Sequence, residues 1–92
     1  MAFQKFTKDP DAILDYQWDW SAWLATVGDT LAAVAFIAED GITVDSSEFS
    51  DTAATAWISG GTLGTTYSVV CRVTTTGGRV DDRTAELKIV ER

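Results

Sequence analysis

The amino-acid sequence predicts an all-β fold, an antiparallel β-sandwich of about seven strands with one short helical turn near residues 20–25. Three observations predict it. Short segments alternate apolar with polar residues, turn-forming residues separate them at intervals of roughly 8 to 12 positions, and no long amphipathic helix is present. The chain has 92 residues, the length of one domain, so residues 1–92 are expected to form a single sandwich.

The first two strands are expected near the N-terminus. Residues 3–7 are predicted to form an edge strand, with Pro10 in the loop beyond it. Residues 14–20 alternate aromatic and apolar side chains with polar ones, so every second side chain lies on the same face of a strand. Tyr16 and Trp18 are therefore expected to face the core.

A helical turn is expected after the second strand. Trp20, Trp23 and Leu24 stand at the i, i+3 and i+4 spacing of a helix, and Asp19 is placed to cap it. Three tryptophans within six positions exceed what an ordinary small core holds, so Trp20 or Trp23 should be partly exposed. Both are candidate protein-interface residues, because tryptophan is frequent among binding hot spots. The alternative is that the turn folds over the open end of the sandwich and its tryptophans plug it.

The middle of the chain supplies three further strands. Residues 31–38 form the longest apolar run, which predicts a strand buried on both faces, although its alanines also permit a short helix. Shorter strands are expected at 42–44 and 53–58, and Trp57 is assigned to the core. The glycine-rich segment 59–64 is expected to be a loop, since it lacks the Lys-Ser/Thr and the following helix of a phosphate-binding loop.

The C-terminal third contains the clearest β pattern. Residues 65–76 alternate with a period of two, and residues 83–90 do the same, with Gly77 and Gly78 between them. Two glycines tolerate the positive φ of a tight turn, so the last two strands should form a hairpin. Tyr67 stands near the start of its strand, as in the tyrosine corner of immunoglobulin-like domains. The predicted sandwich is therefore immunoglobulin-like.

The residue types argue against catalysis. The chain has no histidine, the usual general base and metal ligand. Its single cysteine, Cys71, falls on the apolar register of a strand, where a buried, unreactive thiol is expected. Carboxylates are plentiful, but none is arranged as in known calcium-binding loops. No catalytic, cofactor-binding or metal-binding residue is predicted.

Charge and processing signals narrow the range of partners. The formal net charge is −7 and the pI about 4.2, which disfavours nucleic acid and anionic membranes as partners. One cysteine permits no internal disulfide, and no apolar stretch has the length of a signal peptide or a bilayer span. Folding in a reducing cytoplasm is expected.

Four sequence blocks resemble a known family. They are Asp15-Tyr16-x-Trp18-Asp19-Trp20-Ser21-x-Trp23-Leu24, Gly28-Asp29-Thr30, Trp57-Ile58-Ser59-Gly60-Gly61-Thr62-x-Gly64-x-x-Tyr67, and Thr75-x-x-Gly78-Arg79 with Asp82-Arg83-Thr84. Over nearly its whole length the sequence resembles the fiber-tail adaptor proteins of tailed bacteriophages. The resemblance implies a non-enzymatic virion structural protein at the neck or tail, made in the host cytoplasm. It also implies an immunoglobulin-like fold, many copies or a homo-oligomer in the particle, and contacts with portal, tail, fiber or capsid proteins.

Two alternatives stay open at this point. The chain could decorate the capsid or join head to tail. It could also bind carbohydrate on a cell surface, with Trp20 and Trp23 as a platform on which sugar rings stack. An enzyme would need a convergent polar pocket, of which the sequence gives no sign.

Overall fold

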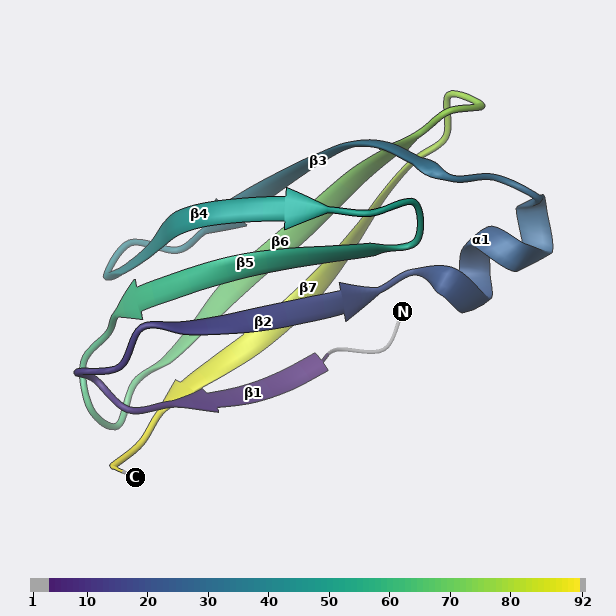
Figure 1. The fold of residues 1–92 in the computed structure, drawn as a ribbon. Helices are drawn as coiled ribbons and strands as arrows, with labels where there is room; N and C mark the ends of the chain where they lie inside the picture. The colour runs from purple at the N-terminus through teal and green to yellow at the C-terminus, as the bar shows by residue number, and fades with distance from the viewer. Residues whose placement is uncertain (1–3, 92) are drawn as a thin grey trace.

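The computed structural model describes residues 4–91 and contains seven strands and one helix (Figure 1). The elements are β1 (Gln4–Lys8), β2 (Leu14–Asp19), α1 (Ser21–Val27), β3 (Leu31–Ala38), β4 (Ile42–Phe49), β5 (Ala53–Gly60), β6 (Thr66–Thr75) and β7 (Val80–Ile89). Every predicted element is present, although residue 3, the first of the predicted strand 3–7, lies outside the described residues. The strands β4, β5 and β7 are longer than their sequence patterns indicated.

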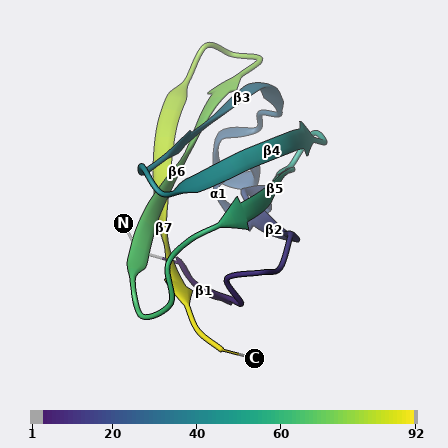
Figure 2. The same cartoon turned by 90° about the vertical axis from the view of Figure 1, so that its left-hand side faces the viewer.

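The strands form two sheets packed face to face (Figure 2). One sheet has the order β1-β7-β6-β3 and the other the order β2-β5-β4. For β2 to β7 this is the strand order of an immunoglobulin constant-type domain, so the predicted immunoglobulin-like sandwich is confirmed. One pair departs from the expected antiparallel arrangement, because β1 runs parallel to β7 at the edge of the larger sheet.

The core lies between the two sheets and is built by alternate residues of each strand. Tyr16 and Trp18 point inward from β2, as predicted. Phe6 packs against both, with ring centroids 4.8 Å from Tyr16 and 5.4 Å from Trp18, and Phe36 lies 5.1 Å from Trp18 on the other side. Aromatic pairs of this kind contribute about 0.5–1.5 kcal/mol each beyond the area they bury.

The strand β3 has the predicted bounds but not the predicted burial. It is the edge strand of its sheet, and only alternate residues face the core. Val34, Phe36 and Ala38 pack inward, whereas the Ile37 side chain is 47% exposed. The prediction of burial on both faces was wrong, because an apolar run does not reveal whether another layer covers the outer face of the sheet.

The end of the sandwich opposite α1 is held by polar contacts that reach across the strands (Figure 1). The phenol oxygen of Tyr67 accepts a hydrogen bond from the backbone N–H of Thr62 at 3.0 Å, which confirms the tyrosine corner. Gly41 lies against the same ring with φ at +109°, where a Cβ atom would come within 2.6 Å of it. The buried Lys8 ammonium donates to the carbonyl oxygens of Asp9 and Gly60 at 2.7 and 2.8 Å.

The C-terminal hairpin is formed as predicted. Strands β6 and β7 pair antiparallel over their length, and Gly78 takes a φ of +90° in the turn between them. Thr75 and Arg79 close the turn through a backbone hydrogen bond of 2.8 Å. Alternate residues of both strands, from Tyr67 to Ile89, fill the core.

Candidate protein interface

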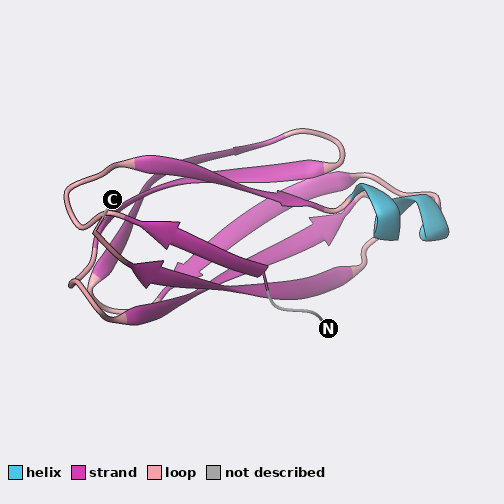
Figure 3. Ribbon diagram, turned by 90° about the horizontal axis from the view of Figure 1, so that it is seen from below, coloured by secondary structure: helices cyan, strands magenta, loops and turns pink. Residues whose placement is uncertain are grey.

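The helix α1 and its flanking loops lie at one end of the sandwich (Figure 3). The helix begins after Trp20, which is the N-cap residue and makes no side-chain cap hydrogen bond, so the predicted capping by Asp19 was wrong. The Asp19 carboxylate instead accepts the N–H of Ser21 at 2.9 Å, one residue before the cap. Hydrogen bonds from the side chain and backbone of Ser21 lower the pKa of Asp19. Gly28 ends the helix in a left-handed conformation with φ at +64°.

Trp20, one of the two predicted interface residues, is completely buried. The Trp23 ring meets it edge to face at 5.6 Å, and the Arg83 guanidinium lies over it, 4.1 Å from the ring centroid. Arg83 is fixed there because it donates to the backbone oxygen of Asp19 at 2.7 Å. Trp20 therefore fills the open end of the sandwich, as the alternative interpretation proposed. Its complete burial argues against the prediction that it contacts another protein. Trp23 is half-buried, which confirms that one of the pair is partly exposed.

Cys71 lies on the inward face of β6 near Trp20 and is buried, as predicted. Desolvation raises the pKa of its thiol to about 11, and the neighbouring Trp20 and Arg83 side chains only partly oppose this rise. The thiol is therefore neutral at physiological pH. A buried neutral thiol acts as a small apolar core residue.

Asp29 ties the loop after α1 to the β6–β7 hairpin. Its carboxylate accepts the backbone N–H of Gly77 at 3.1 Å and pairs with the Arg79 guanidinium at 2.9 Å. Hydrogen bonds from the Thr75 side chain, then from the Thr30 and Gly77 backbones and the Arg79 side chain, lower the pKa of Asp29 to about 2. These contacts fix the end of the sandwich around Trp20.

The prediction for Trp57 was wrong. It was assigned to the core, but its side chain points outward from β5 and is 40% exposed. The inward face of β5 is formed by Ala54, Ala56 and Ile58, which are fully buried. The signal was present in the sequence, because those three positions are all apolar whereas the face that includes Trp57 also carries Thr55.

The edge of β3 is a second exposed apolar feature. Its sequence from Leu31 to Ala38 contains no charged residue and no proline. The other sheet edges carry charges, as Lys5 on β1, Asp15 on β2 and Glu48 on β4 illustrate. Both β4 and β3 contain a bulge, and the one in β3 falls between Leu31 and Ala33, so residues 33–38 are the part of this edge without charge, proline or bulge. Charges, proline and bulges are the usual means of protecting an edge from pairing with another chain.

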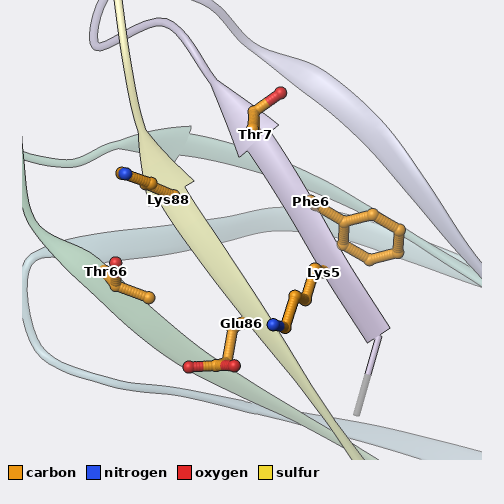
Figure 4. A pocket seen from close by; sticks show the side chains of 6 residues that line it. All are labelled: Lys5, Phe6, Thr7, Thr66, Glu86 and Lys88. Atoms are coloured by element: carbon orange, nitrogen blue, oxygen red, sulfur yellow. The ribbon is translucent and has the colours of Figure 1, made fainter.

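The surface of the sandwich has several depressions. One of about 280 Å³ lies on the β1–β7–β6 side and is lined by Lys5, Phe6, Thr7, Thr66, Glu86 and Lys88 (Figure 4). Within residues 4–91 no three acidic, cysteine or histidine side chains gather where they could hold a metal ion. The described part of the chain also contains no helix long and apolar enough to cross a membrane.

The small β-sandwich has exposed large apolar side chains on its strands, at Ile37, Phe49, Trp57 and Val80, and in its loops, at Ile13 and Leu63, which is a surface compatible with the class of protein-binding modules. The profile of one family, described as podophage GP4 fiber-tail adaptor protein gp77, matches residues 8–88, and the chain belongs to this family. A search among curated proteins found no match. The chain is thus a non-enzymatic structural adaptor, a component of the phage virion tail that binds other virion proteins.

Proposed function

We propose that the chain connects fiber to tail near the neck of the particle, in many copies, and that one partner pairs with the edge of β3. The observation that carries this proposal is the uncharged edge of β3, regular from Ala33 to Ala38, with Ile37 exposed. An adaptor has to present a surface on which another chain can dock. An unprotected strand edge is such a surface, because its free N–H and C=O groups template a further strand.

The side chains of β3 would give this pairing its specificity. Ala33, Ala35 and Ile37 lie on the outer face, opposite Thr74, Arg72 and Val70 of β6. A strand added to this edge would continue the same face of the sheet with small and apolar neighbours.

Trp23 remains the interface candidate at the α1 end. It is half-buried against Trp20, and the helix that carries it leads through Gly28 directly into β3. The Leu31 N–H donates to the backbone oxygen of Asp51 at 2.8 Å, so a partner strand would pair with β3 from Ala33 onward, and contact with Trp23 would be a separate part of the interface. The carbohydrate-binding alternative loses support, because burial of Trp20 removes the paired stacking platform that it requires.

Phage particles provide the test. We expect mass spectrometry of purified virions to detect the chain, and absence from intact particles would contradict the adaptor role. Ile37→Lys places a charge on the exposed face of the β3 edge and should yield particles that lack fibers while the purified variant stays folded. Leu63→Lys, at an exposed loop residue away from that edge, is the matched control and should leave fiber attachment intact.

A further inference from the structure

The charges of the chain are divided between its two sheets. All seven lysines and arginines lie outside residues 9–71, which contain none. The β2–β5–β4 sheet falls entirely inside that segment, so its strands carry carboxylates and no cation. The β1–β7–β6 part of the other sheet carries Lys5, Arg72 and Lys88 on its outer face, together with Glu86 and with Asp82, which pairs with Arg72 at 2.8 Å. The two outer faces point in opposite directions, and one is acidic whereas the other has a small excess of cations.

Trp57 lies in the middle of the acidic face. It projects from the central strand β5, with Asp15 of β2 and Ser46 of β4 as its cross-strand neighbours. One position along the same face, Thr55 is flanked by Gln17 and Glu48. A partly exposed tryptophan with carboxylates around it attracts a cation on two counts, through the ring face and through the negative charge.

The opposite face offers a matching depression. Figure 4 shows Lys5 on β1 and Lys88 on β7 around a pocket that also includes Glu86. The pocket opens to the outer side of the β1–β7 pair, and its volume of about 280 Å³ has room for one aromatic side chain. Two lysines against one glutamate leave its rim positive.

We propose that the outer face of β2–β5–β4 docks on a second copy of this chain, with Trp57 seated in the pocket between Lys5 and Lys88 of the next copy. In this contact the lysine ammonium groups approach the indole face and the Asp15 carboxylate. The chain already uses the same chemistry internally, where Arg83 covers Trp20 at 4.1 Å. Because the two surfaces differ, the contact is head-to-tail and builds a ring or a stack of copies.

The contact should be weak for a single pair. Three strands of six to eight residues present a face of roughly 14 by 25 Å, which is well below the about 800 Å² per partner of a stable complex. The net charge of −7 on each copy adds repulsion at long range. Free subunits would therefore stay apart, and closure of a ring on a tail scaffold would strengthen the contact by raising the effective concentration.

Sedimentation velocity of the full chain between about 10 μM and 1 mM tests the proposal. We expect the sedimentation coefficient to rise with concentration, with a dissociation constant of about 0.1–1 mM for the pair. Trp57→Ala should weaken this association at least about tenfold, and Lys5→Glu combined with Lys88→Glu should do the same. Leu63→Ala, which removes an exposed apolar side chain from a loop, should leave it unchanged.

A mixing experiment identifies the head-to-tail geometry. The Trp57→Ala chain keeps an intact basic face, and the Lys5→Glu/Lys88→Glu chain keeps an intact tryptophan face. Neither should associate alone, yet an equimolar mixture should form heterodimers and nothing larger, because only one native contact remains.

Three results would overturn the proposal. They are a chain that stays monomeric at 1 mM, self-association that survives Trp57→Ala, and a mixture of the two variants that stays monomeric. In the first case the acidic face would serve a basic partner of another kind. The inference assumes the proposed multi-copy adaptor role, but a failure here would leave detection of the chain in virions unaffected, so the two proposals fail separately.

Discussion

Trp20 at the α1 end and Trp57 on the outer sheet face are the same type of residue in opposite environments, one buried and one exposed. Trp20 is fully buried because Trp23 and Arg83 cover it, whereas Trp57 is 40% exposed with only short or acidic cross-strand neighbours. The residues that cover Trp20 come partly from β7, more than sixty positions further along the chain. Distant strands therefore decide whether a tryptophan of this sandwich stabilises the fold or remains available for contact.

The largest expected effect is at the buried member of the pair. Trp20→Ala removes a fully buried indole and leaves a cavity, so we expect the free energy of unfolding to fall by about 3–5 kcal/mol. That is a large share of the about 5–15 kcal/mol of an ordinary domain. Urea unfolding followed by far-ultraviolet circular dichroism measures it. A loss below about 1 kcal/mol would show that the tryptophan does not support the end of the sandwich.

A substitution of Arg83 tests how much the guanidinium that covers the Trp20 ring contributes to stability. Arg83→Met keeps much of the side-chain volume but removes the cation over Trp20 and the hydrogen bond to the Asp19 carbonyl. We expect a loss of about 1–2 kcal/mol in the free energy of unfolding. Arg83→Lys, which retains the charge, is the matched control and should lose less. Equal stability of the methionine variant and the unchanged chain would remove Arg83 from the explanation.

A substitution of Asp29 tests the polar contacts that join the loop after α1 to the β6–β7 hairpin. Its pKa is lowered to about 2 in the folded chain, below its ordinary value of 3.8. The stability that it contributes is therefore complete above about pH 4 and lost as the pH falls through about 2. We expect Asp29→Asn to be less stable than the unchanged chain at pH 7, and the difference to shrink between pH 4 and pH 2.

Urea midpoints at pH 7, 4, 3 and 2 measure this dependence. Asp40→Asn, at an exposed carboxylate in the β3–β4 turn, is the control and should show no such convergence. A constant difference between the Asp29 variant and the unchanged chain at all four values would contradict the assignment.

The smallest effect on stability is expected at the exposed member of the pair. Trp57→Ala removes a side chain that lies on a solvent-facing sheet surface, so the free energy of unfolding should change by no more than about 0.5–1 kcal/mol. Urea unfolding under the same conditions as for Trp20→Ala gives a direct comparison. If both substitutions cost the same, the division between a supporting and an available tryptophan is wrong.

Local patterns predicted much of the fold. The period-two alternation of β6, the glycines of the β6–β7 turn and the helical spacing after Asp19 each led to the element that the structure contains. The Tyr67 corner was predictable as well, because it depends on a short stretch of chain between Thr62 and Tyr67. These features follow from interactions between residues close in sequence.

The candidate interface was less predictable. The apolar run of β3 predicted a strand buried on both faces, but β3 lies at the edge of its sheet and Ile37 on its outer face is exposed. Trp57 was assigned to the core but faces outward, and of Trp20 and Trp23 only Trp23 is partly exposed, because the packing of distant strands decides the burial of each ring. The parallel pairing of β1 with β7 joins the two ends of the chain and has no local signal.

By itself, the sequence determined a small acidic all-β chain with no histidine, one cysteine and all its cations outside residues 9–71. Backbone propensity, turn chemistry and net charge are local or additive properties, so they can be read from residues alone. Only the tertiary structure decided that Arg83 covers Trp20, that β3 lies at an edge and that Trp57 stands on the acidic face. Those outcomes depend on which strands pair and pack across the sandwich, and each such contact joins residues far apart in the chain.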